Sequence, residues 1–121
     1  MSGQEYKFEK LEIYRLALDL VVEVYEICKT FPRSEEFGLT SQVKRAVTSV
    51  ALNIAEGSAA GGDKEFNRFM NMSVCSLVET KAGLGITVKL GFITEQDIMK
   101  VSAMIDNLFF KELAFKKSLS H

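Results

Sequence analysis

The sequence is poor in the residues that break helices and in those that build metal sites. Its 121 residues include one proline, eight glycines, two cysteines, one histidine and no tryptophan. An all-β domain needs frequent turn residues, so this scarcity argues against that class. Zinc sites need clustered cysteine and histidine, and di-iron bundles need Glu-x-x-His pairs. Neither pattern is present, and we therefore expect no metal and no cofactor.

Residues for nucleophilic catalysis are equally scarce. The only histidine is His121, the last residue, and a Ser–His or Cys–His pair would depend on it alone. Cys28 and Cys75 lie within apolar helical patterns and are interpreted as reduced core residues. The spacing of Gly57 and Gly62 lacks the lysine and the preceding strand of a phosphate-binding loop. We expect no catalytic residue and no enzyme.

An excess of one charge is also missing, as are long hydrophobic runs. Fifteen Lys and Arg against 16 Asp and Glu give a net charge of −1, which excludes attachment to nucleic acid mainly through bulk positive charge. No apolar run approaches the roughly 20 residues that span a bilayer, and the N-terminus has no signal-peptide core. We predict a cytoplasmic protein with no membrane contact.

What the sequence does contain is apolar periodicity of the helical type. No segment sustains the period-two alternation of a strand. Four helical segments joined by short links predict an all-α fold, an antiparallel up-down-up-down four-helix bundle that forms a single domain over residues 1–121. The expected helices cover residues 6–30, 39–56, 64–90 and 95–117.

The links between these segments carry helix stop and start signals. Pro32 ends the first helix because it lacks a backbone donor. Gly57 is interpreted as the stop of the second helix and Asp63 as the N-cap of the third. Thr94 and Asp97 have the spacing of a capping box before the fourth helix.

Two glycines lie inside the third expected helix. Gly83 and Gly85 each cost roughly 1 kcal/mol there relative to alanine. Small residues at these positions are expected if another helix backbone passes close by.

The first expected helix is apolar around most of its circumference. Two neighbouring rows have helical spacing: Leu11, Tyr14, Leu18, Val21, Tyr25 and Cys28 in one, and Ile13, Leu16, Ala17, Leu20, Val24 and Ile27 in the other. A helix that packs against one core needs an apolar arc of little more than 100°. The wider arc indicates either a central helix of the bundle or a helix shared between the core and a subunit interface.

The second expected helix carries a polar row whose members share one face. The row is Gln42, Arg45, Ser49, Asn53 and Glu56. The antiparallel third helix should place Ser76 and Glu79 opposite it. One hypothesis is a structural polar network that fixes helix register, with Arg45 paired to Glu79. The other is a polar groove for RNA or a protein ligand.

Basic side chains on the second and third helices are the candidate contacts for a partner. They are Lys44, Lys64 and Arg68. In one interpretation they belong to a solvated face with i,i+4 pairs. In the other, copies of the chain assemble, and a few cations from each copy become a concentrated basic surface.

The order of the motifs resembles a known family. The motifs are Phe31-Pro32, Glu35-Glu-Phe-Gly-Leu39, Gln42-x-x-Arg45-Ala46-x-x-Ser49, Asn53-Ile-Ala-Glu-Gly57, Phe66-x-x-Phe69, Ser76-x-x-Glu79 and Leu90-Gly91. Together they resemble the bacterial four-helix bundle proteins encoded in intervening sequences of 23S ribosomal RNA genes, a ribosomal-protein-like family. The accessory protein of diversity-generating retroelements is similar to this family at the superfamily level.

The resemblance implies a homopentamer with a central channel, associated with RNA or an RNA-binding protein, and no catalytic residues. Family members commonly carry Gly-Arg after the Glu-Gly step, where this chain has Ser58 and Ala59. We predict a non-enzymatic homo-oligomeric scaffold associated with ribosomal RNA or another nucleic acid. The alternative is a purely protein-binding or structural oligomer with no nucleic-acid role, which the net charge and the missing arginine favour.

Overall fold

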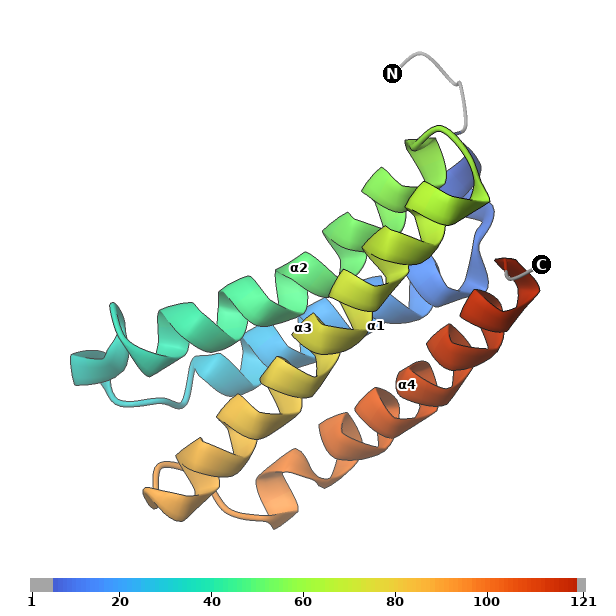
Figure 1. Cartoon of the computed structure of the whole chain (residues 1–121). Helices are drawn as coiled ribbons and strands as arrows, with labels where there is room; N and C mark the ends of the chain where they lie inside the picture. Colours follow the sequence, from blue (N-terminus) through green and yellow to red (C-terminus); the bar gives the residue numbers. More distant parts are fainter. Residues whose placement is uncertain (1–5, 120–121) are drawn as a thin grey trace.

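The computed structural model describes residues 6–119, and its long helices run up and down beside one another (Figure 1). The helices are α1 (Glu12–Cys28), α2 (Leu39–Ala59), α3 (Asp63–Lys89) and α4 (Met99–Leu119), with short 3-10 turns η1 (Lys7–Lys10), η2 (Arg33–Glu35) and η3 (Gln96–Ile98). Residues 6–119 contain no strand. The predicted all-α antiparallel four-helix bundle is confirmed.

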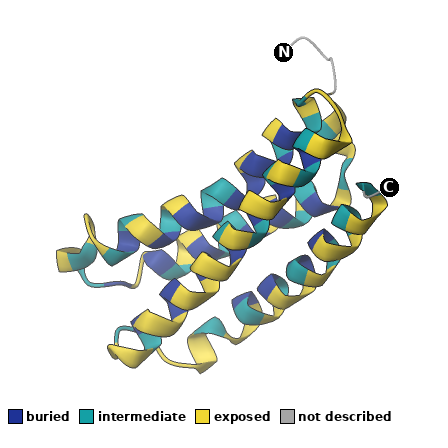
Figure 2. Cartoon of the chain, viewed as in Figure 1, coloured by how far each residue is buried: buried dark blue, intermediate teal, exposed yellow. Residues whose placement is uncertain are grey.

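The core is built from one apolar stripe of each helix, which faces inward in Figure 2. Its fully buried side chains include Leu20, Val47, Ile54, Met70, Leu77 and Leu108. On α1 the buried row is Ile13, Ala17, Leu20, Val24 and Cys28. The neighbouring apolar row of α1 stays partly in solvent: Leu18 is 42% exposed and Tyr25 is 38% exposed. The core therefore takes one row and Cys28 of the other, while Leu11, Tyr14 and Val21 of that other row pack against the core in part.

Side chains of the neighbouring helix press on the backbones of α2 and α3 at two glycines. A Cβ on Gly57 would lie 2.8 Å from Phe66 Cδ1 and 2.8 Å from Phe69 Cβ, and a Cβ on Gly83 would lie 2.8 Å from Val43 Cγ2. At Gly83 the close neighbour is thus a side chain of α2 and not the helix backbone that was expected. At Gly85 a Cβ would meet nothing within 4 Å, so no close approach is present there.

Two helix boundaries differ from the expectation. The first helix, expected over residues 6–30, is broken at Leu11, whose backbone is extended (φ −78°, ψ 129°). The break leaves η1 as a separate turn whose Phe8 ring packs on Tyr14 with 4.8 Å between ring centroids. The second helix passes Gly57, its expected stop, by two residues and ends at Ala59, because Gly57 is still helical and is buried against α3 in the last turn.

The starts of α3 and α4 also differ from the expectation, by one and by four residues. Gly62, with φ 134°, is the N-cap of α3, and Asp63 is the first helical residue. The predicted capping box is present: Thr94 N donates to Asp97 Oδ2 (2.8 Å) and Asp97 N donates to Thr94 Oγ1 (3.2 Å). It starts the 3-10 turn η3, which leads into α4.

Candidate functional site

The polar row of α2 lies along the seam between α2 and α3 and on the outer side of α2. Asn53, which is 6% exposed, donates from Nδ2 to both the carbonyl and the Oγ of Ser49, at 2.9 Å each. Ser76 Oγ on α3 lies 3.0 Å from Ser49 Oγ. These three side chains link α2 to α3 and satisfy one another.

The expected ion pair between Arg45 and Glu79 is not formed. Glu79 instead accepts a long hydrogen bond of 3.5 Å from Gln42 Nε2. Arg45 makes no ion pair with any residue between 6 and 119, although it and Glu79 line the same hollow of about 290 Å³. The charge of Arg45 is therefore available at the surface.

A larger groove of about 690 Å³ runs along the outer side of α2. Its apolar walls come from Tyr25, Phe37, Leu52 and Met72, and its polar lining includes Lys44, Arg45, Asn53, Glu36 and Glu56. Phe37 is 91% exposed and Leu52 is 56% exposed. The polar row was visible in the sequence. The apolar walls were not, because they come from three helices and a link.

The three candidate contact cations are not brought together. Lys44 lies over the Tyr25 ring, 5.0 Å from its centroid, in the second turn of α2. Lys64 and Arg68 lie in the first turns of α3, beside the C-terminal end of α2, where Phe66 and Phe69 pack on Gly57. Thirteen residues separate Lys44 from Gly57, which corresponds to about 20 Å along a helix axis. The cations therefore form two separate groups.

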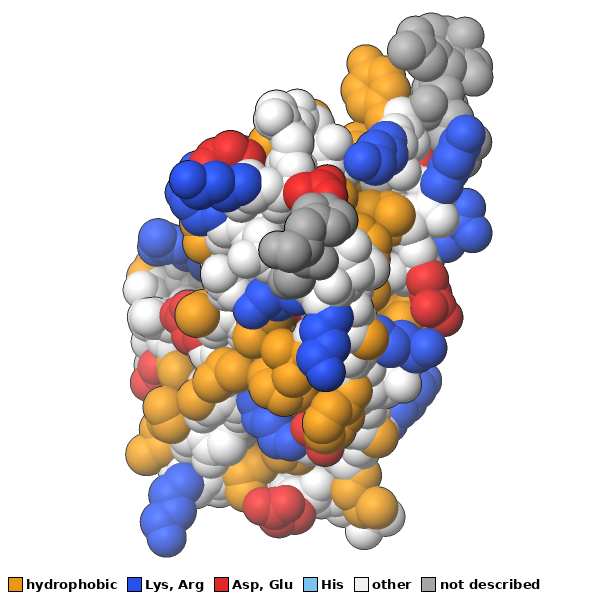
Figure 3. Space-filling model, turned by 45° about the vertical axis from the view of Figure 1, so that its right-hand side comes forward, with side chains coloured by type: hydrophobic (Ala, Val, Ile, Leu, Met, Phe, Trp, Pro, Cys, Tyr) orange, Lys and Arg blue, Asp and Glu red, His pale blue; other side chains and the backbone are white. Residues whose placement is uncertain are grey.

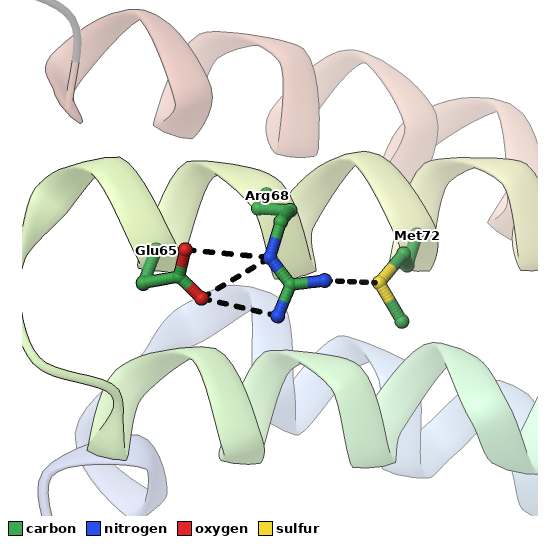
Figure 4. A network of polar contacts seen from close by, with 3 residues as sticks. All are labelled: Glu65, Arg68 and Met72. Carbon is green, nitrogen blue, oxygen red and sulfur yellow. Dashed lines mark hydrogen bonds and ion pairs between the residues drawn. The ribbon is translucent and has the colours of Figure 1, made fainter.

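Arg68 also has local partners (Figure 4). Its Nε lies 3.1 Å from Glu65 Oε1, and its Nη1 lies 3.8 Å from Met72 Sδ. The guanidinium also stacks on Phe69, 4.7 Å from the ring centroid. Because Glu65 neutralises Arg68 locally, Lys64 is the less restrained cation at this end of α3.

A buried carboxyl group on α4 is a feature that the sequence analysis missed. Glu112 is fully buried, and its Oε2 lies 2.9 Å from Ser73 Oγ on α3. Burial raises the pKa of Glu112 to about 7, against smaller lowering effects of the Ser73 hydrogen bond and the charge of Lys116. The signal was present in the sequence, since position 112 continues the buried row of Val101, Ile105 and Leu108.

The hydrogen bonds around Ser73 indicate which form of Glu112 fits the site. Ser73 Oγ lies 2.9 Å from the Val50 carbonyl oxygen as well as 2.9 Å from Glu112 Oε2. A hydroxyl has one hydrogen and can donate to only one of these oxygens. A protonated Glu112 satisfies both contacts, because the acid donates to Ser73 and Ser73 donates to Val50. This chain of bonds ties α4 to α3 and α2.

The cysteines differ from the expectation that both are core residues. Cys28 is buried and Cys75 is exposed. Burial raises the pKa of the Cys28 thiol to about 11, against a smaller lowering by Lys44, so this thiol stays protonated and weakly nucleophilic. Within residues 6–119 no group of three or more His, Cys, Asp or Glu side chains could hold a metal ion. His121 lies outside the described residues.

Comparison with known proteins places this bundle in a family. The family model described as "23S rRNA-intervening sequence protein" matches residues 9–111. The chain belongs to this family. The match spans all four helices up to Lys111, including the polar row and the groove of α2. No curated protein matches the sequence.

A solved structure shows the same fold. It is a protein of unknown function from the S23 ribosomal protein family of Bacteroides thetaiotaomicron VPI-5482, with a TM-score of 0.80 and 20% sequence identity. The similarity covers 87% of this chain and 98% of that one. Among residues 6–119, no helix combines the length and the apolar character needed to cross a membrane.

Proposed function

We propose that the protein is a non-enzymatic homo-oligomeric scaffold of the cytoplasm. The observation that carries the proposal is the hydrophobic surface that the bundle leaves uncovered. On the side of α1 and α2, Leu18, Val22, Tyr25 and Leu52 are between 38% and 60% exposed. Exposed apolar residues that gather on one face are typical of interaction sites. The subunit count of five follows from the family resemblance.

A second group of exposed hydrophobic side chains lies on α3 and α4. Val78 is 52% exposed, Ile86 is 49% exposed and Phe110 is 68% exposed. Figure 3 shows hydrophobic side chains gathered on one face of the molecule, with Lys and Arg around them. One contact would not cover both groups of exposed apolar side chains. The two groups therefore support a protein that binds several partners at once, as a scaffold does.

Substitution at Leu18 tests self-association. The side chain points away from the core, so Leu18→Glu should place a charge in the subunit contact and leave the bundle folded. We expect light scattering to show a lower mass at micromolar concentration, with unchanged helical circular dichroism. An unchanged mass would contradict the use of this face, and a loss of helix would show that Leu18 belongs to the core.

Association with ribosomal RNA or another nucleic acid is the second part of the proposal. The family description and the exposed Lys64 support it. In an assembly, Lys44, Lys64 and Arg68 of several copies would act together. Retention of a ribosomal RNA fragment on a filter should then fall steeply with salt, because each phosphate contact releases counterions. No retention at about 50 mM salt would contradict this part.

A purely protein-binding oligomer is the alternative. Two observations favour it: the cations form separate groups, and a mostly apolar groove of about 370 Å³ lies between α3 and α4. Pull-down from lysate with and without nuclease separates the two functions. Partners that survive nuclease treatment support protein binding, and partners that disappear support the nucleic-acid role.

A further inference from the structure

The outer faces of α1 and α2 carry complementary unpaired charges. Three of the four acids of α1 have ion-pair partners: Glu12 with Lys111 (3.4 Å), Glu23 with Lys100 (3.4 Å) and Glu26 with Lys29 (2.6 Å). The fourth acid is Asp19, which is exposed and forms no ion pair with any residue that the structure describes.

Asp19 lies within the uncovered apolar surface of α1. Leu18 is its neighbour in sequence, and Val22 follows one turn later; these side chains are 42% and 60% exposed. Together, Leu18, Asp19 and Val22 form a small amphipathic surface, which we call the α1 ridge. Its composition suits insertion into a groove that offers apolar walls and a cation without an ion-pair partner.

The groove on α2 has this composition. Arg45, which has no ion-pair partner in the described chain, lines it together with the apolar side chains of Phe37, Leu52 and Met72. Lys44, the only other cation of α2, is placed over the Tyr25 ring. A guanidinium forms two parallel hydrogen bonds with a carboxylate, which makes Arg45 a specific receptor for an acidic side chain.

We propose that the α1 ridge of a second copy of this chain occupies the α2 groove, with Asp19 of one copy bound to Arg45 of the other. This inference rests on the homo-oligomer proposed above and adds the residues that pair. The contact covers Leu18, Val22 and Leu52 together. Each of these apolar side chains is exposed in the single chain.

An RNA strand is a poorer occupant of the same groove. Glu36 and Glu56 line it on either side of Arg45 along the chain, and their charges repel phosphates. Phe37, Leu52 and Met72 offer apolar contact instead of the basic path that follows a nucleic-acid backbone. Acids with apolar walls suit an amphipathic protein helix that carries charges of both signs, as α1 does with Arg15 and Asp19.

Charge exchange tests the pairing in the full chain. Asp19→Arg places two cations in the contact, and Arg45→Asp places two acids there. Close charge pairs at interfaces contribute enough that each single variant should raise the dissociation constant of the assembly by at least about tenfold. Mixing the two variants in equal amounts should restore assembly, because each then meets an opposite charge in the other.

The measurement is sedimentation velocity at micromolar concentration, with circular dichroism to verify folding. Glu95→Arg and Lys89→Asp are the matched controls, since they make the same charge changes at exposed positions outside the ridge and groove. Both controls should sediment like the wild-type chain.

Each other outcome has a distinct meaning. A monomeric wild-type chain overturns the proposed homo-oligomer and this inference together. An oligomer that neither single variant weakens overturns the inference alone, as does a mixture that fails to reassemble. Unchanged sedimentation of Arg45→Asp with loss of RNA retention would assign the groove to nucleic acid and also overturn the inference.

Discussion

The two seams that α3 makes, with α2 and with α4, are held in different ways. Gly57 of α2 lies directly against Phe66 and Phe69, Gly83 of α3 lies directly against Val43, and a hydrogen bond joins Ser49 and Ser76 across that seam. The seam with α4 leaves an apolar groove of about 370 Å³ at the surface. Its polar links are Glu112 with Ser73 inside and Lys81 with Asp106 outside. The first seam depends on shape and the second on a few ionisable groups, so they should respond to different perturbations.

The largest expected effect is a pH dependence of the seam with α4. The pKa of Glu112 is raised from about 4.5 to about 7 by folding. Between these values the unfolded chain releases a proton that the folded chain keeps, so this group's contribution to stability falls as pH rises, by about 3 kcal/mol in total. Below pH 4.5 and above pH 7 the contribution is constant.

Glu112→Gln isolates this effect, because the amide nitrogen can donate to Ser73 as the protonated acid does. We expect the variant to lose this part of the pH slope and to be more stable than wild type at pH 8. Urea unfolding of both chains at pH 5 and pH 8 measures the difference. If the unfolding free energy changed equally between pH 5 and pH 8 in both chains, Glu112 would already be ionised in the folded chain.

The next effect tests the shape of the seam between α2 and α3. Gly57→Ala should destabilise the bundle by about 2 kcal/mol, because the new Cβ overlaps Phe69 Cβ and the Phe66 ring. Gly85→Ala makes the same change on α3 where the space is open. It should stabilise the bundle by up to about 1 kcal/mol through helix propensity. Thermal unfolding of the two variants measures both effects. Midpoint temperatures that shift in the same direction would contradict the close approach at Gly57.

The smallest effect belongs to the surface ion pair on the seam with α4. Both partners are about half exposed, with side-chain exposures of 48% for Lys81 and 55% for Asp106. Such pairs contribute below about 1 kcal/mol, so Lys81→Ala should hardly move the urea midpoint. A loss as large as that of Gly57→Ala would mean that this pair, and not Glu112, is the main polar link to α4.

Much of the bundle could be predicted from the sequence, because its signals are local. The stop at Pro32 and the capping box of Thr94 and Asp97 depend on backbone chemistry within a few residues. Gly57 was wrongly predicted to stop the second helix, because a glycine that ends a helix and a glycine that makes room for a neighbouring helix look the same in one sequence. Only the position of Phe66 and Phe69 on α3 decides between them.

The candidate site was harder to predict for a related reason. The polar row of α2 follows from helical spacing, but the partner of each member depends on side-chain reach across the seam, so Gln42 and not Arg45 meets Glu79. Glu112 was missed because a glutamate is normally expected at the surface, although its position continues the buried row of α4.

Sedimentation velocity of the unmodified chain at micromolar concentration tests the central claim most directly. The proposed scaffold predicts one species whose mass is a multiple of the 13.5 kDa chain. A single well-behaved species of 13.5 kDa would contradict it, because the exposed side chains of α1 and α2 would then need no second copy to cover them.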